Sequence, residues 1–196
     1  MSYFDLIINI TEAFICTLFV YKLFNRKFST YLIASLFYSG VITACNFTSS
    51  PEIIMIVLSI LILFSYSHFL NKANYLQNIF IALYINTLVN VATTLSICFS
   101  TLLAKFPIDS VDGYHLMAMI SKPILLVLVL ATASHIKKYY FLESQVLKYI
   151  TISIVLLNFI FKFFIRFSIN VKELFTDCNI FLLFFCFLIF FRNADT

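Results

Sequence analysis

Charged residues make up only 11% of this 196-residue sequence, against about 25% in an ordinary soluble domain, while hydrophobic residues make up 62%. One core in a chain of this length cannot bury so much apolar surface, which excludes a water-soluble globule. The bilayer must therefore act as the solvent. The sequence predicts an all-α, polytopic membrane helix bundle in which residues 1–196 form a single integral membrane domain.

Glycine (2), proline (3) and tryptophan (0) are scarce as well. Because Gly-rich phosphate loops are absent, nucleotide binding in such a loop is excluded. Gly-x-Ser-x-Gly and His-Glu-x-x-His are also missing, and the three histidines fall at span ends or in loops. We expect no enzyme activity, no cofactor and no nucleic-acid partner. The cysteines lie scattered in apolar runs without metal-ligand spacing, so neither a metal site nor a disulfide framework is expected: Cys16, Cys45, Cys98, Cys178 and Cys186.

Polar residues divide the chain into stretches that approach the roughly 20 apolar residues needed for a membrane-spanning helix. The first begins without the basic segment of a signal peptide, since Asp5 stands there instead. Pro51 fits the first turn of the third helix, and Pro123 is expected to end or kink a turn in the fifth. Seven spans are predicted, with six as the alternative: 4–24, 30–47, 52–70, 76–103, 115–134, 147–169 and 175–191.

Basic residues indicate the orientation, because they are retained preferentially on the cytoplasmic side. An external N-terminus places the larger group of basic residues inside: Lys22, Arg26, Lys27, Lys72, Lys137, Lys138, Lys148 and Arg192. The smaller group then belongs to the outer half: Lys105, Lys122, Lys162, Arg166 and Lys172. The sequence therefore predicts a multi-pass cell-membrane protein with its N-terminus outside and its C-terminus in the cytoplasm, which requires an odd number of spans.

Ionisable side chains inside spans are candidate functional groups, because each costs roughly 2.5–3.5 kcal/mol at the centre of a membrane helix. In the first span, helical spacing puts four polar residues on one face: Asp5, Asn9, Glu12 and Cys16. In the sixth span, Asn158, Lys162 and Arg166 share a face. Since Glu12 and Lys162 lie at similar depths, we expect Glu12 to pair with Lys162 or Arg166. The alternative is that both cations extend to the outer headgroups and Glu12 is neutral or hydrogen-bonded.

A second polar face lies on the fourth predicted span, where Asn86, Asn90 and Thr94 follow at intervals of four residues, with Asn78 and Thr87 nearby. Lipid cannot satisfy a side-chain amide, so this face is expected to lie against other helices. These residues either form hydrogen bonds between helices or line a ligand cavity.

The first span resembles that of peptide-sensing receptor histidine kinases of the accessory gene regulator C type. An acid follows Asn-Ile early, and a Phe-rich helix then ends in Tyr-Lys-x-Phe-Asn; these residues run from Ile7-Ile8-Asn9-Ile10-Thr11-Glu12 to Tyr21-Lys22-Leu23-Phe24-Asn25. The seven-span plan and the Phe/Ile/Asn-rich composition extend the resemblance along the chain. It implies a membrane sensor for a secreted peptide, with a kinase domain following in the family.

This sequence ends four residues after Arg192, without a kinase half. The expectation is therefore either a truncated sensor or a stand-alone sensor or regulatory module without catalysis. Its expected partners are the lipid bilayer, a second copy in a homodimer, a peptide ligand, and a separate cytoplasmic kinase or other partner protein. The alternatives are a small transport component, such as the substrate-binding subunit of an importer, and an envelope assembly protein. The scarcity of glycine argues against a transporter built on interrupted helices.

Overall fold

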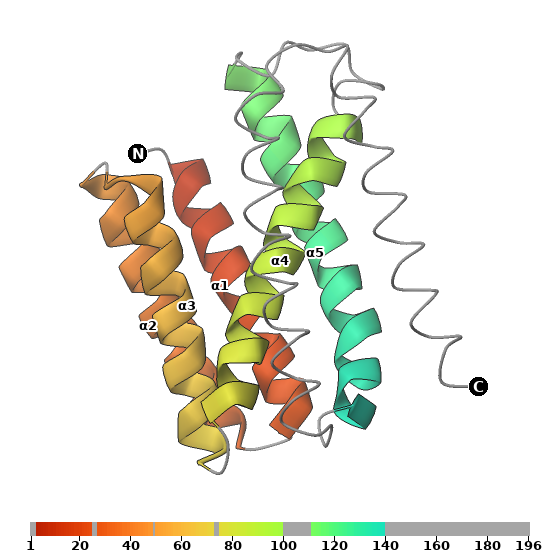
Figure 1. Ribbon diagram of the computed structural model, residues 1–196. Coiled ribbons are helices and arrows are strands. Elements are labelled where there is room, and N and C mark those ends of the chain that lie inside the picture. The colour runs from red at the N-terminus through yellow and green to blue at the C-terminus, as the bar shows by residue number, and fades with distance from the viewer. Residues whose placement is uncertain (1–2, 25–26, 49, 73–74, 100–110, 140–196) are drawn as a thin grey trace.

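Five antiparallel helices form the part of the protein that the structure, a computed structural model, describes: residues 3–24, 27–48, 50–72, 75–99 and 111–139 (Figure 1). The helices are α1 (Tyr3–Phe24), α2 (Phe28–Phe47), α3 (Glu52–Leu70), α4 (Tyr75–Phe99) and α5 (Val111–Tyr139). Successive helices run in opposite directions, so α1, α3 and α5 begin at one end of the bundle and finish at the other.

Four of these helices are long and apolar enough to cross a membrane, namely α1, α2, α4 and α5, and α3 contains a shorter apolar stretch, Ile54–Leu70. Large apolar side chains also cover the outside of the bundle. On α2, for example, Ile33, Leu36 and Phe37 are each more than 60% exposed. Such a surface is unfavourable in water and favourable in lipid. The described helices therefore form a bundle of membrane-spanning character.

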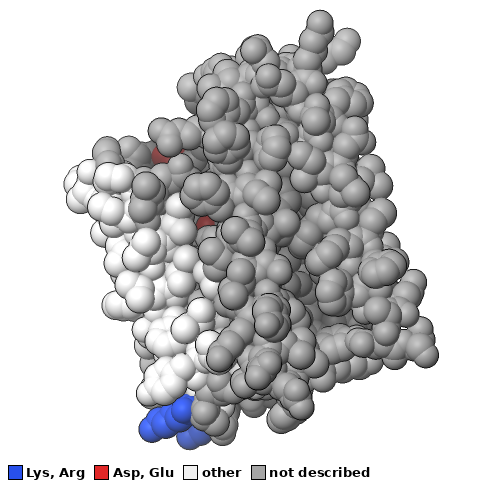
Figure 2. Space-filling view, in the orientation of Figure 1, with Lys and Arg blue, Asp and Glu red and all other residues white. Residues whose placement is uncertain are grey.

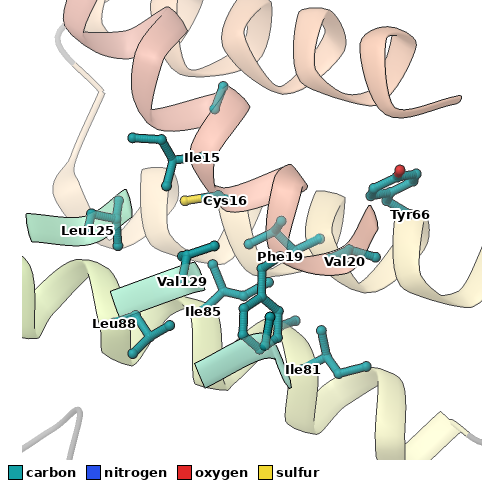
Figure 3. Packing of buried hydrophobic residues seen from close by; sticks show 14 of the residues in the cluster. Ile15, Cys16, Phe19, Val20, Tyr66, Ile81, Ile85, Leu88, Leu125 and Val129 are labelled. Atoms are coloured by element: carbon teal, nitrogen blue, oxygen red, sulfur yellow. The ribbon is translucent and has the colours of Figure 1, made fainter. Parts of the chain in front are cut away.

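Helix α1 lies at the centre of the bundle, since it contacts each of the other four helices. Its buried face meets α4 and α5, as Figure 3 shows: Phe19 lies among Ile81 and Ile85 of α4 and Val129 of α5. Phe19, Ile81 and Ile85 are completely buried. Dispersion contacts of this kind drive helix association in lipid, where the hydrophobic effect between helices is weak.

Hydroxyl groups join α1 to α2 in the middle of their interface. The Thr17 and Ser35 hydroxyls lie 2.6 Å apart, and both residues are fully buried. One hydroxyl donates to the other, and the second donates to a carbonyl of its own helix; the Ala13 carbonyl lies 2.7 Å from the Thr17 hydroxyl, and the Tyr31 carbonyl lies 2.8 Å from the Ser35 hydroxyl. The Tyr31 hydroxyl in turn donates to the Phe14 carbonyl at 3.2 Å. The Thr17 and Ser35 hydroxyls at the middle of this interface thus have protein partners.

The predicted spans within the described residues correspond to α1–α5, and all of these elements are helical. The observed α5 is longer than the predicted span 115–134 at both ends. The predicted spans 147–169 and 175–191 lie outside the described residues.

Two prolines test the local predictions. Pro51 stands immediately before the first residue of α3, and its carbonyl accepts the Ile54 amide at 2.9 Å. The expectation that α5 could end at Pro123 is wrong, because the helix continues across it. Proline removes one helical hydrogen bond, that to the Met119 carbonyl. Membrane helices tolerate this loss where packing against neighbouring helices holds the chain in place, and α5 packs against both α1 and α4.

Candidate functional site

An ion pair joins the first and fifth helices inside the bundle: the Lys122 ammonium of α5 donates to the Glu12 carboxylate of α1. The two side chains are 13% and 23% exposed, respectively, so neither is freely hydrated. We call these two residues the α1–α5 ion pair. It lies between helices that are far apart in sequence but extensively packed against each other.

The two charges meet because they lie at similar depths. Helices α1 and α5 begin at the same end of the bundle (Figure 1). At 1.5 Å per residue, Glu12 lies about 14 Å along the axis from Tyr3, and Lys122 about 17 Å from Val111. An isolated charge at such a depth in a membrane would be costly, whereas a hydrogen-bonded pair offsets much of that cost.

Other polar side chains surround the α1–α5 ion pair. Cys16 follows Glu12 by one helical turn on α1 and is fully buried, as a free thiol. Tyr38 of α2, only 2% exposed, lies beside that thiol. Tyr114 of α5 lies within electrostatic range of Glu12 and Lys122. Side chains from α1, α2 and α5 therefore converge at this level of the bundle.

Asn9 extends this polar region toward the beginning of α1. Its carbonyl oxygen Oδ1 accepts a 3.1 Å hydrogen bond from Asn46 Nδ2 of α2. Its own Nδ2 is buried and has no hydrogen-bond partner among the described residues, and the same is true of Thr43 Oγ1 on α2. An unpaired buried donor is unfavourable by about 1–3 kcal/mol. This half of the α1–α2 interface therefore retains hydrogen-bonding capacity, unlike the Thr17–Ser35 contact.

A second polar cluster lies at the opposite end of the bundle, between α3 and α4. Asn78 is completely buried; its Oδ1 accepts from the Ser67 hydroxyl at 2.7 Å, and its Nδ2 lies 3.0 Å from the Asn71 carbonyl and 3.3 Å from His68 Nδ1. The His68 ring stacks between Phe64 and Tyr75. We call Ser67, His68, Asn71 and Asn78 the α3–α4 amide cluster. The cluster links the end of α3 to the beginning of α4, next to the short connection between them.

The predicted polar face of α4 is covered in part by the rest of the bundle. Thr94 is buried, while Asn86 and Asn90 are partly buried. The Thr94 hydroxyl donates to the Asn90 carbonyl at 2.9 Å, and Thr87 is buried one turn before Asn90. The expected burial is thus confirmed for Thr94 and partial for the two asparagines.

Glu12 has a cationic partner, but the cation is not one of those predicted for it. The structure pairs it with Lys122, and the predicted alternatives Lys162 and Arg166 lie outside the described residues, as does Asn158. The signal for Lys122 was present in the sequence: it lies about 10 Å below the beginning of the predicted span 115–134, the same depth as Lys162. Lys122 was nevertheless not among the ionisable residues singled out inside the predicted spans, which were Glu12, Lys162 and Arg166.

Within the described helices, His, Cys, Asp and Glu side chains form no group of three or more that could hold a metal ion. The α1–α5 ion pair can form charge-assisted hydrogen bonds with a polar or charged group.

Comparisons of this chain with family models, with curated proteins and with solved structures gave no match.

Proposed function

We propose that this chain is an integral membrane sensor or regulatory module without catalysis of its own, and that the α1–α5 ion pair couples ligand binding to helix arrangement. The observation that carries the proposal is the placement of Glu12 and Lys122 on two helices that meet only through tertiary packing. A charged pair of this kind contributes little net stability compared with an apolar contact of the same volume. Its presence therefore favours a role beyond holding the bundle together.

The mechanism follows from competition for the two charges. An amphipathic peptide could place its apolar side chains against the bundle and offer a carboxylate to Lys122 or an ammonium to Glu12. When a peptide carboxylate takes Lys122, the released Glu12 carboxylate needs new donors, and Asn9 Nδ2 and Thr43 Oγ1, which lack partners among the described residues, lie in the same half of the bundle. Because a ligand shifts an equilibrium only through its different affinities for two states, this exchange is the step that would move α1 relative to α5.

In this proposal the chain has seven spans, an external N-terminus and a cytoplasmic C-terminus. The ends of α1, α3 and α5 then face the cytoplasm, and lysines at this end of the bundle support the assignment. The readout would pass at this side to a partner protein, such as a separate kinase, or to a second copy of the chain.

Orientation is tested with single cysteines in a background whose native cysteines are replaced by alanine. A membrane-impermeant maleimide added to intact cells should label Ser50→Cys, between α2 and α3, and should not label Lys27→Cys, before α2. A reporter fused after Thr196 should be active only in the cytoplasm. Labelling of Lys27→Cys with protection of Ser50→Cys would reverse the orientation.

Sensing is tested with the chain in lipid nanodiscs and the small-peptide fraction of the host cell's culture medium as the probe. A ligand that binds only the folded state raises the melting temperature with concentration. We expect a saturable rise for the wild type and for Glu52→Gln, and at least a tenfold higher half-saturating concentration for Glu12→Gln. Absence of any rise would contradict sensing of a secreted peptide, whereas equal responses of all three proteins would contradict the role of the ion pair.

A further inference from the structure

The described charges are separated along the bundle. Three exposed lysines lie at the end where α1 and α3 finish and α2 and α4 begin: Lys22, Lys27 and Lys72. Helix α5 finishes at the same end and carries Lys137 and Lys138 in its last turn. Figure 2 shows basic side chains gathered at this end of the visible face, with acidic atoms well away from it.

The acidic residues of the described helices all belong to the other end or the half adjoining it. Glu52 and Asp112 lie in the first turns of α3 and α5, Asp5 in that of α1, and Glu12 is already paired with Lys122. No described acid therefore neutralises the lysine-bearing end. The described part of this end therefore carries an excess of positive charge.

The connections at this end are too short to carry the lysines away from the membrane. Only residues 25–27 separate α1 from α2, and only residues 71–74 separate α3 from α4. Lys22 is in the last turn of α1, and Lys27 immediately precedes α2. A lysine stem reaches only a few ångströms beyond its helix, so the ammonium groups lie at the level of lipid headgroups.

Aromatic rings mark the same level. Tyr21, Phe28 and Tyr31 form a cluster with centroid separations of 5.3–6.3 Å, next in sequence to Lys22 and Lys27. Tyrosine side chains gather at the boundary between hydrocarbon and headgroups, where the ring is in an apolar layer and the hydroxyl is hydrated. Lysines beside such a cluster face headgroups rather than a distant protein surface.

From these observations we propose that the lysine-bearing end, defined by Lys22, Lys27 and Lys72, is a binding surface for the headgroups of anionic phospholipids. The proposal goes beyond the sensor function and does not depend on it. Basic residues next to membrane helices attract anionic lipids, with each lysine near the surface changing the affinity by about fivefold. Three helix ends supply the cations, so one or two phosphate groups could contact several of them at once.

The test uses the full chain and two lipids of matched chain length, phosphatidylglycerol and phosphatidylcholine, with binding counted by native mass spectrometry. We expect the wild type to prefer phosphatidylglycerol, and the variant K22Q/K27Q/K72Q to lose most of that preference, up to about a hundredfold. The charge-preserving variant K22R/K27R/K72R should retain it. The preference should also weaken in high salt, because salt screens exposed charges.

Single variants supply a matched control. Lys72→Gln should reduce the preference, and Lys72→Arg, which keeps the charge, should not. Circular dichroism and melting in phosphatidylcholine alone must be equal across all variants, so that loss of binding is not loss of the fold. Equal binding of the two lipids by the wild type, or an unchanged preference in the triple glutamine variant, would overturn the proposal. So would capture of an acidic protein partner by these lysines without any lipid preference.

Discussion

The two polar clusters of the bundle differ in how completely their groups are paired. In the α3–α4 amide cluster, Asn78 is fully buried and both ends of its amide are hydrogen-bonded. Around the α1–α5 ion pair, two opposite charges meet, and Asn9 Nδ2 and Thr43 Oγ1 nearby lack partners among the described residues. The first cluster is neutral and satisfied, and the second is charged and incompletely satisfied.

The difference separates a structural role from a functional one. A satisfied neutral network makes one arrangement of α3 and α4 much better than any other. A charged pair with free donors beside it stabilises less than an apolar contact would, and it can exchange its partners for those of a ligand. We therefore assign the fold of the α3–α4 hairpin to the amide cluster and the proposed coupling to the ion pair.

The largest effect is expected from Glu12→Gln. This substitution leaves the Lys122 ammonium without its anion, and breaking a buried pair from one side is strongly destabilising. Because the two side chains keep some exposure, we expect a loss of about 2–3 kcal/mol in the free energy of unfolding. The measurement is an unfolding titration with sodium dodecyl sulfate in mixed micelles. Glu52→Gln, at the first residue of α3, should change the free energy of unfolding by less than about 0.5 kcal/mol. Equal losses in Glu12→Gln and Glu52→Gln would show that the pairing of Glu12 does not matter for stability.

A slightly smaller effect is expected from Asn78→Ala. The substitution removes the partner of Ser67, His68 and the Asn71 carbonyl in one step, and we expect a loss of about 2 kcal/mol. If the amide cluster is structural, only stability is lost. The variant then melts at a lower temperature without peptide, but the peptide fraction raises that temperature by as much as it does in the wild type. If the variant keeps its stability but no longer responds to the peptide fraction, the α3–α4 amide cluster has a functional role, and the assignment of roles to the two clusters is wrong.

The smallest effect is expected from a pair of serines on α3. Ser67 is completely buried and donates to Asn78, whereas Ser65 is exposed. Ser67→Ala removes one hydrogen bond and leaves its acceptor on Asn78 unpaired, so it should lower the free energy of unfolding by about 1 kcal/mol. Ser65→Ala should change the free energy of unfolding by close to zero. The difference between the two titration midpoints measures the contribution of the hydroxyl bond alone. Indistinguishable midpoints would show that Asn78 holds the hairpin without Ser67.

The helices were predictable because the length of an apolar stretch is a local property of the sequence. The beginning of α3 follows Pro51 as expected, and α1 matches its predicted span closely. Pro123 was harder, since its effect depends on neighbours: the lost hydrogen bond is tolerated because α5 is packed against α1 and α4. Tertiary packing of this kind is not visible in local sequence patterns.

The candidate site was only half predictable. Periodicity and depth identified Glu12 as a charge that needs a partner, and both are properties of one helix. The choice of Lys122 depends on which helices are neighbours, and several cations at similar depth satisfied the same rule. Asn78 illustrates the opposite case, because it was noted only as lying near the polar face of α4, yet its position opposite Ser67 makes it the centre of a cluster.

The most direct test of the central claim is a double-mutant cycle on the α1–α5 ion pair in lipid bicelles, with Glu12→Gln, Lys122→Gln and the double variant. The free energy of unfolding is measured for each protein and for the wild type. We expect the double variant to lose less stability than the two single variants lose together, with a coupling free energy of about 1–3 kcal/mol between Glu12 and Lys122. Additive losses, with a coupling free energy of zero, would contradict the claim that Glu12 and Lys122 interact directly across the interface between α1 and α5.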